Sequence, residues 1–305
     1  MAGLVVLEKM VMLVLLMMVG FVAAKGKWVD ESFGQKASFL VANVFIVATI
    51  LASVVGMEPL FSGRELVLAV VAVFVLFAIG GVLGWLCARF LPLSPGDRTA
   101  AWLSVFFMNN VFIGFPVVEA LFGKNAVFCA ALTGLPFNLL LFSLGVSRLR
   151  AGQGRGRVKL REVFSPALIA TLISILFFLG QIPFPQLVAD TVQTLGGATV
   201  PLSMVIIGIS LSQVPIREAL TDWRAYGVSL VRLILCPLAV WAVLRLFVGG
   251  TVLGVLTVIA ACPSGAMITI LSLRYGVDET FATRVNFVST VLCAGTLPLV
   301  THILL

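Results

Sequence analysis

Charged residues are scarce in this sequence. They make up 11% of its 305 residues, whereas a soluble domain carries roughly 25%. Hydrophobic residues make up 61%, and the mean hydropathy is +1.17, so the composition argues against a soluble domain and favours a protein that spans a lipid bilayer. The net charge of +7 comes mainly from basic residues in loops between apolar runs, so no nucleic-acid partner is expected.

Side chains that carry chemistry are equally scarce. The one histidine, His302, lies at the C-terminal end, and the five cysteines lie in apolar runs without a metal-binding spacing. The sequence has no Walker A loop, which argues against an ATP-driven pump. Its apolar runs show no carboxylate, histidine or Ser/Lys constellation of the kind that membrane enzymes use. We therefore expect a protein that is not an enzyme and needs neither metal nor cofactor, although coupling to Na⁺ or H⁺ stays open.

Ten apolar runs divide the chain, each long enough to form a transmembrane helix. They cover residues 4–24, 37–57, 65–91, 99–122, 125–147, 164–181, 195–213, 223–248, 251–272 and 280–304. The first run carries Glu8 and Lys9 and is interpreted as a span, not as a cleaved signal peptide. The sequence thus predicts an all-α polytopic membrane protein, with a five-helix repeat over 1–147, a basic linker over 148–163 and a second five-helix repeat over 164–305.

Basic residues are distributed unevenly between the two ends of these runs. Fifteen lie in the loops after the odd-numbered runs, four lie on the opposite side, and Arg232 lies inside the eighth run. The positive-inside rule therefore predicts a cytoplasmic linker and both termini outside, in a cytoplasmic (inner) membrane. This orientation explains the basic linker, for which a lipid-binding patch is the alternative.

Two of the runs are interrupted near the middle by polar residues, glycine and proline. These residues are Asn109, Asn110, Gly114 and Pro116 in the fourth run, and Pro263, Ser264 and Gly265 in the ninth. Proline removes a backbone donor and an asparagine amide is costly in hydrocarbon without a partner, so both helices are expected to unwind there. Five runs on each side of a linker indicate inverted repeats, and broken helices at corresponding places in two repeats are typical of a transporter's binding site.

The two halves show weak sequence similarity around these breaks. Aligning Gly123 with Gly276 shifts the first half by 153 positions onto the second. Pro116 and Pro263 do not superpose in that register. The similarity therefore supports a correspondence of spans, not of individual residues.

The middle of each broken run contains no Lys, Arg, Asp or Glu. An anion there would be held by half-helix N-termini, amides and hydroxyls, with Asn109, Asn110 and Ser264 as the first candidates. The second-rank candidates, each of which could instead bond a neighbouring helix, are Asn43, Asn138 and Asn286. For Arg232, snorkelling to the cytoplasmic face and a functional role are both open.

Several motifs identify a family resemblance that covers the whole chain. The run "NNVFIGFPVVEALFG" (109–123) resembles the fourth-span motif of the auxin efflux carrier family and its bacterial members, and the segment 260–299 resembles the family's C-terminal signature. The stretches "GGATVPLSMVIIGISLS" and "RLILCPL" also fit. The long cytoplasmic loop of the plant members is absent, and Asn43 lies in a run where a proline was expected.

The resemblance implies ten spans in two inverted five-helix repeats, with broken helices 4 and 9 crossing each other. It implies a scaffold of spans 1, 2, 6 and 7 and a transport domain of spans 3–5 and 8–10. It also implies an organic anion as substrate, such as malonate, malate or an auxin-like carboxylate. By this analogy Asn109, Pro116 and Pro263 shape the carboxylate site.

The resulting hypothesis is a secondary transporter that moves organic anions by alternating access. One alternative is a sodium-coupled symporter of the bile-acid-transporter-like fold, and another is a membrane sensor that transports nothing. The expected partners are the small organic anion and membrane lipid, and a homodimer is left open.

Overall fold

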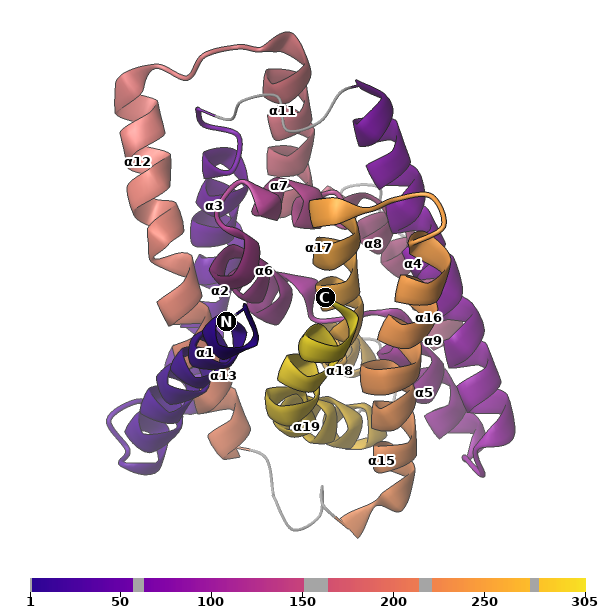
Figure 1. Cartoon of the computed structure of the whole chain (residues 1–305). Helices are drawn as coiled ribbons and strands as arrows, with labels where there is room; N and C mark the ends of the chain where they lie inside the picture. Colours follow the sequence, from indigo (N-terminus) through magenta and orange to yellow (C-terminus); the bar gives the residue numbers. More distant parts are fainter. Residues whose placement is uncertain (1, 57–62, 151–163, 214–220, 275–279) are drawn as a thin grey trace.

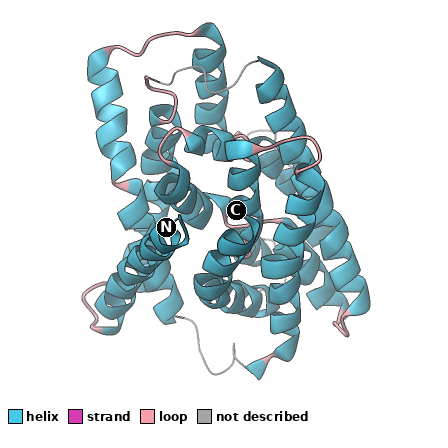
Figure 2. Ribbon diagram, viewed as in Figure 1, coloured by secondary structure: helices cyan, strands magenta, loops and turns pink. Residues whose placement is uncertain are grey.

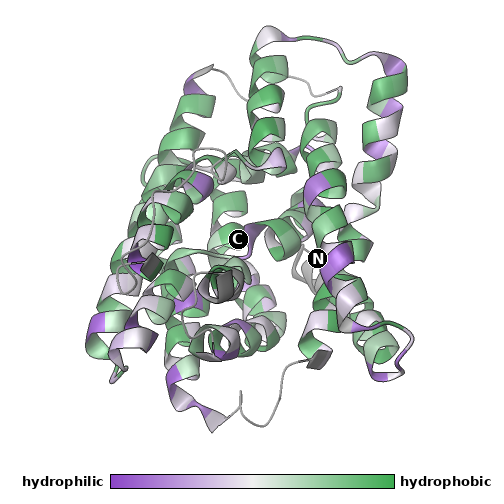
Figure 3. Ribbon diagram, turned by 180° about the vertical axis from the view of Figure 1, so that it is seen from behind, coloured by the Kyte–Doolittle hydropathy of each residue, from purple (hydrophilic) through white to green (hydrophobic). Residues whose placement is uncertain are grey.

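The computed structural model describes residues 2–56, 63–150, 164–213, 221–274 and 280–305, and these residues are almost entirely helical (Figure 2). Among the described residues, six helices are long and apolar enough to cross a membrane, and four further apolar helices are shorter. Hydrophobic residues predominate along most of these helices (Figure 3), and many of their side chains are exposed, among them Leu187, Leu246 and Phe90, each more than 75% exposed. The prediction of an all-α membrane protein is confirmed.

The helices pack in two groups (Figure 1). The first, here called the flanking group, contains α1 (Ala2–Lys25), α2 (Glu31–Leu40), the π-helical turn η1 (Val41–Phe45), α3 (Ile46–Ala52), α11 (Pro166–Gly180), α12 (Gln186–Gly197) and α13 (Thr199–Gln213). Within it α1 packs along α13, and α3 packs against α11 and α12. The grouping is the one that the resemblance implies for a scaffold.

The second group, here called the crossover group, contains the two interrupted runs. Its elements are α4 (Gly63–Phe90), α5 (Pro95–Phe106), η2 (Asn110–Gly114), α6 (Phe115–Phe122), α7 (Ala126–Ala131), α8 (Gly134–Leu140), η3 (Leu141–Gly145), α9 (Val146–Arg150), α15 (Trp223–Leu230), η4 (Val231–Leu235), α16 (Cys236–Leu244), α17 (Gly250–Ala261), α18 (Met267–Arg274) and α19 (Thr280–Leu304). Here α4 packs against α5 and α16, and α19 packs against α5 and α15. The groups meet where α1 and α13 contact η2, α6 and α19, and where α3 contacts α7 and α11 contacts α7 and α8.

An ion-pair network ties three helices of the crossover group together at one end. Arg224 at the start of α15 lies 3.2 Å from Asp97 of α5 and 2.9 Å from Asp222, and Arg284 of α19 lies 3.4 Å from Asp222. Hydrogen bonds from Arg224 lower the pKa of Asp222 below its usual value. The network is consistent with these three helices acting as one unit.

The flanking group depends on glycines where α1 crosses α13. A Cβ on Gly20 would overlap the carbonyl oxygen of Val205, and a Cβ on Gly208 would overlap that of Met17. Small residues allow membrane helices to approach until their backbones touch. These two positions therefore admit only glycine without a shift of the helices.

We expect Gly208→Ala to lower the apparent Tm of the purified protein by roughly 4–8 °C, because the new methyl group must push α1 away from α13. In an ordinary helix interior the same exchange stabilises, by about 0.5–1 kcal/mol. Gly295→Ala on α19, where nothing lies within 4 Å of the added Cβ, is the matched control. Equal Tm values for the two variants would contradict the close packing of α1 on α13.

Candidate functional site

The two interrupted runs cross each other at their breaks. α5 ends at Phe106 and α17 ends at Ala261, and the chain then becomes extended in both. The backbone N–H of Asn109 donates to the oxygen of Pro263 at 2.8 Å, and the N–H of Gly265 donates to the oxygen of Phe107 at 2.9 Å. These bonds form an isolated antiparallel bridge between Met108 and Ser264. The expected crossing of the broken helices is therefore observed.

The bridge relates the two halves by a definite register. Residue numbers 108 and 264 differ by 156, and the same shift carries Phe107 onto Pro263 and Asn109 onto Gly265. The shift thus converts each of the two hydrogen bonds into the other, as a local two-fold axis would. The register differs from the shift of 153 that the alignment of Gly123 with Gly276 gives, and Gly276 lies outside the described residues.

Glycine and proline explain why the chain can cross here. A Cβ on Gly265 would lie 3.2 Å from the oxygen of Met108, and one on Gly114 would lie 2.6 Å from the Ile259 side chain. Pro263 has no N–H to leave unsatisfied, and its oxygen accepts the bond from Asn109. Pro116 lies in α6, which continues η2 without a gap, so its missing N–H removes one helix hydrogen bond. Pro263 and Gly265 therefore stabilise the break, whereas Gly114 and Pro116 lie in the helical segment that follows it.

Arg232 is fully buried beneath the crossover and does not snorkel. Only 1% of it is exposed, and its guanidinium donates to four backbone carbonyl oxygens at the ends of the two half-helices. These belong to Val105 (2.9 Å), Cys262 (2.9 Å), Ala260 (2.8 Å) and Ile259 (3.4 Å). The sequence-based expectation that no fixed charge lies at the crossover is thus wrong, because the charge comes from a neighbouring helix.

Arg232 compensates the negative ends of two helices that terminate inside the protein. The last carbonyl groups of a helix have no partner within the helix, and they form the negative end of its dipole. α5 and α17 both end at the crossover, so their carbonyl groups gather in the protein interior. In the described part of the chain, the recorded ion pairs involve Arg224 and Arg284 but not Arg232. The arginine therefore neutralises helix ends, not an acidic side chain.

The sequence contained a signal for this residue. Arg232 lies in the π-helical turn η4, five residues before Pro237, which lies at the start of α16. Proline cannot donate to the carbonyl four residues earlier, and π turns often mark functional sites. An arginine that lies inside an apolar run, five residues before a proline, was therefore a better candidate for a residue of the crossover than its separation in sequence from the two breaks suggested.

Most of the other predicted polar residues lie close to the crossing. The Asn109 side chain accepts from the N–H of Phe112 at 3.2 Å and caps η2. The buried Asn110 amide donates to Thr133 at 3.0 Å. Both amides therefore stabilise the break, and Thr133 is a partner that sequence reasoning missed.

Ser264 and Asn286 carry oxygen atoms whose hydrogen-bonding capacity is unused. The Oγ of Ser264 is buried without a partner, and so is the Oδ1 of Asn286. They are linked through Ser289, whose hydroxyl accepts from the N–H of Ser264 at 3.2 Å and lies 3.2 Å from the backbone oxygen of Asn286. Since buried polar atoms are normally paired, these two atoms are the best candidates for contact with a ligand.

Two second-rank candidates are satisfied within their own helices. Asn43 donates to the oxygen of Phe39 at 2.7 Å, and Asn138 donates to that of Gly134 at 2.9 Å. Asn43 lies in η1 of the flanking group, away from the crossing strands. Neither amide needs a ligand to complete its hydrogen bonds.

A small cavity adjoins the crossover, between the two helix groups. It is lined by Leu13 and Met17 of α1, Met204 of α13, Ile113 of η2, and Thr290 and Cys293 of α19, among others. Its volume is about 30 Å³, which is the space of one water molecule in the liquid. In this conformation the cavity is therefore too small for an organic molecule, and Asn109, Asn110 and Ser264 are not among the residues that line it.

Comparison with known families agrees with this architecture. The model of the family described as "Membrane transport protein" matches residues 5–147 and 155–301. The chain belongs to this family. It is the family of the auxin efflux carriers, which the motifs in the sequence resemble.

This membrane transport protein has relatives among the archaea. An uncharacterized transporter from Methanothermobacter thermautotrophicus is 27% identical over 296 residues, which cover 96% of each chain. Another, from Methanocaldococcus jannaschii, is 28% identical over 232 residues, or 72% of this chain and 73% of the relative. Both names agree with a transport role.

Replacing Arg232 tests its role at the helix ends of this transporter. We expect Arg232→Met to lower the apparent Tm by roughly 5–10 °C, because up to four buried carbonyl groups lose their donor. Arg232→Lys keeps the charge but lacks the planar fork, so we expect an intermediate loss. Arg245→Met, which removes an exposed arginine, should shift the Tm by no more than about 2 °C. An unchanged Tm for Arg232→Met would disprove the capping role.

Proposed function

We propose that this protein is a secondary transporter of small organic anions, with its binding site at the crossover. The observation that carries the proposal is the buried Arg232, which offsets the negative ends of α5 and α17. The helical segments that follow the crossing begin at η2 and α18, and their N-terminal ends form positive poles, of which Asn109 caps the first. Half-helix N-termini at the membrane midplane are typical binding groups for a substrate carboxylate.

The proposed substrate is a mono- or dicarboxylate of the size of malonate or malate, or an auxin-like acid. In this account Asn109, Asn110 and Ser264 surround the carboxylate, while Gly114, Pro116, Pro263 and Gly265 keep the backbone open for it. A hydroxyl such as that of Ser264 can donate to a carboxylate. The family membership supports transport, and the charge balance at the crossover supports the sign of the substrate.

We propose that transport proceeds by alternating access. The cavity of about 30 Å³ is too small for a carboxylate with several carbon atoms, so binding requires the crossover group to move against the flanking group. The contact between the groups supports such a movement, because the side chains lining the cavity are nearly all apolar. The protein would work in the cytoplasmic membrane with both termini outside, as the distribution of basic residues predicts.

Sodium coupling is a second candidate, and one observation favours it. The unpartnered Oδ1 of Asn286 can only accept a hydrogen bond or bind a cation, so a carboxylate cannot satisfy it. A sodium ion held between Asn286, Ser264 and the substrate would do so. Transport of the anion would then depend on a sodium gradient.

Uptake of radiolabelled malonate, malate and indole-acetate into proteoliposomes tests both candidates. We expect saturable uptake, which Asn109→Ala and Ser264→Ala each reduce by roughly tenfold at low substrate concentration, since one charge-assisted hydrogen bond contributes about 1.5–3 kcal/mol. Asn43→Ala and Asn138→Ala are the matched controls, because those amides bond within their own helices, and they should transport normally.

Repeating the assay under sodium, potassium and pH gradients separates the coupling modes. Stimulation by inward sodium alone, lost in Asn286→Ala, would establish the symporter. Full activity of Asn109→Ala and Ser264→Ala would place the binding site elsewhere. Absence of carboxylate transport under every gradient would refute the proposed substrate class.

A further inference from the structure

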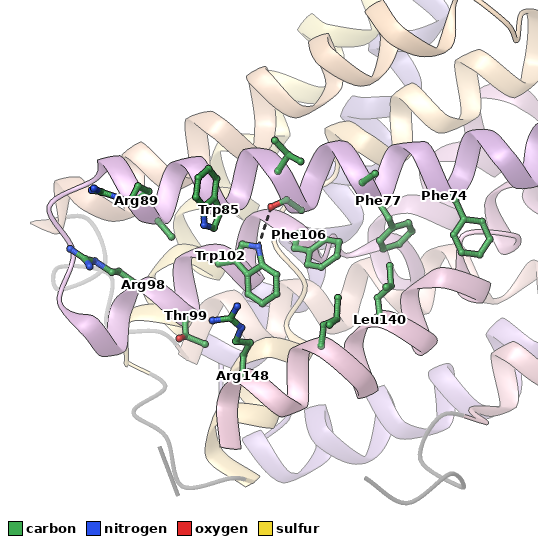
Figure 4. A pocket seen from close by; sticks show the side chains of 15 residues that line it. Phe74, Phe77, Trp85, Arg89, Arg98, Thr99, Trp102, Phe106, Leu140 and Arg148 are labelled. Carbon is green, nitrogen blue, oxygen red and sulfur yellow. Dashed lines mark hydrogen bonds between the residues drawn. The ribbon is translucent and has the colours of Figure 1, made fainter. Parts of the chain in front are cut away.

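A large groove lies away from the crossover, between α4, α5 and the helical segment formed by α8, η3 and α9 (Figure 4). Its volume is about 720 Å³. Residues from Phe74 to Arg89 of α4 line one wall, and this span of 15 positions corresponds to about 22 Å at 1.5 Å per residue. One leaflet of a bilayer has a hydrocarbon depth of about 15 Å, so the groove is long enough to run from the headgroup region through one leaflet.

The two ends of the groove differ in character. Three arginines line the half of the groove nearer the short α4–α5 loop: Arg89 and Arg98 lie beside that loop, and Arg148 lies farther along, next to Trp102 (Figure 4). The other end is apolar and includes Phe74, 44% exposed, and Phe77. A ligand that fills the groove must therefore carry a negative head and a long apolar tail.

The basic end is structured by aromatic contacts. The Arg148 guanidinium lies over the ring of Trp102 at 5.6 Å, and the Trp102 Nε1 donates to the oxygen of Gly81 at 3.1 Å. Trp85, 61% exposed, stands at the same end. Tryptophan is enriched at membrane–water interfaces. We therefore place Trp85, Trp102 and the three arginines beside them at the level of the lipid phosphates.

The charge at this end is not neutralised within the described residues. Asp97, which precedes Arg98, is paired with Arg224 of α15 at 3.2 Å. The other recorded ion pairs join Asp222 to Arg224 and Arg284. These three arginines line one groove, and no described carboxylate forms an ion pair with them. They therefore form a strong site for a phosphate.

We propose that this groove binds an anionic phospholipid, with the headgroup at the basic end formed by Arg89, Arg98 and Arg148 and an acyl chain along the exposed side chains of Val82 and Phe74. The positive-inside orientation puts the basic end on the cytoplasmic side, so the lipid belongs to the inner leaflet. The site lies on the lipid-facing side of the crossover group. A bound lipid would travel with that group or be exchanged when it moves.

Native mass spectrometry of the delipidated full-length protein, titrated with phosphatidylglycerol or phosphatidylcholine of identical chains, tests this proposal. We expect phosphatidylglycerol to bind preferentially, and Arg89→Gln/Arg98→Gln/Arg148→Gln to weaken that binding by about tenfold or more. A charge-matched control, Lys25→Gln/Lys27→Gln/Lys36→Gln, removes three basic residues far from the groove and should retain the preference.

A steric variant tests the apolar half of the site with the charge unchanged. Ala78 is exposed and lines the groove, so we expect Ala78→Trp to block phosphatidylglycerol as strongly as the loss of the arginines. Equal binding of both lipids by the wild type, or equal losses in the arginine and lysine triple variants, would refute the proposal. Competition by soluble glycerol phosphate at the same concentration as the lipid would show a small-anion site instead.

Discussion

Breaking a helix inside a membrane leaves backbone groups without water, and the structure is organised around supplying partners for them. The two broken helices supply part of the answer to each other, through the paired bonds between Asn109 and Pro263 and between Gly265 and Phe107. The guanidinium of Arg232 supplies the rest by binding carbonyl groups of both. Each unsatisfied group in hydrocarbon costs several kcal/mol, so these bonds decide where α4, α5, α16 and α17 pack.

The same constraint explains the division of the molecule. Spans that share the crossover are joined by directional bonds, including the network of Asp97, Arg224, Asp222 and Arg284 at one end. The flanking spans are joined by close backbone packing at Gly20 and Gly208 and by buried hydrogen bonds from Thr49 to Gly196 and Thr199 and from Ser174 to Ile50. The boundary between the groups consists largely of apolar side chains, which resist sliding far less than hydrogen-bonded pairs do. The alternating access proposed above would take place at this boundary.

The sequence predicted the helices well because long apolar runs have few alternatives in a membrane. The predicted break at Pro263–Gly265 was correct for the same reason, since proline cannot remain in an intact buried helix without cost. In the fourth run the break lies at Phe107–Asn109, and Gly114 and Pro116 lie in the helical segment that follows it. The sequence did not reveal the register of the crossing or the role of Arg232. Both depend on which carbonyl groups meet in space, and a search for charges within the broken runs could not detect a donor from another run.

Arg232 also makes the charge distribution around the crossover asymmetric. The local two-fold relation exchanges the crossing strands, but α4, which pairs with α16 beside them, carries no charged residue between Glu65 and Arg89. One side of the crossing thus has an arginine and the other has aliphatic and aromatic side chains. A protein with equivalent halves would stand open to either compartment with equal ease. Here a membrane potential acts on the buried guanidinium of Arg232, and α4 contributes no equivalent charge on the other side of the crossing.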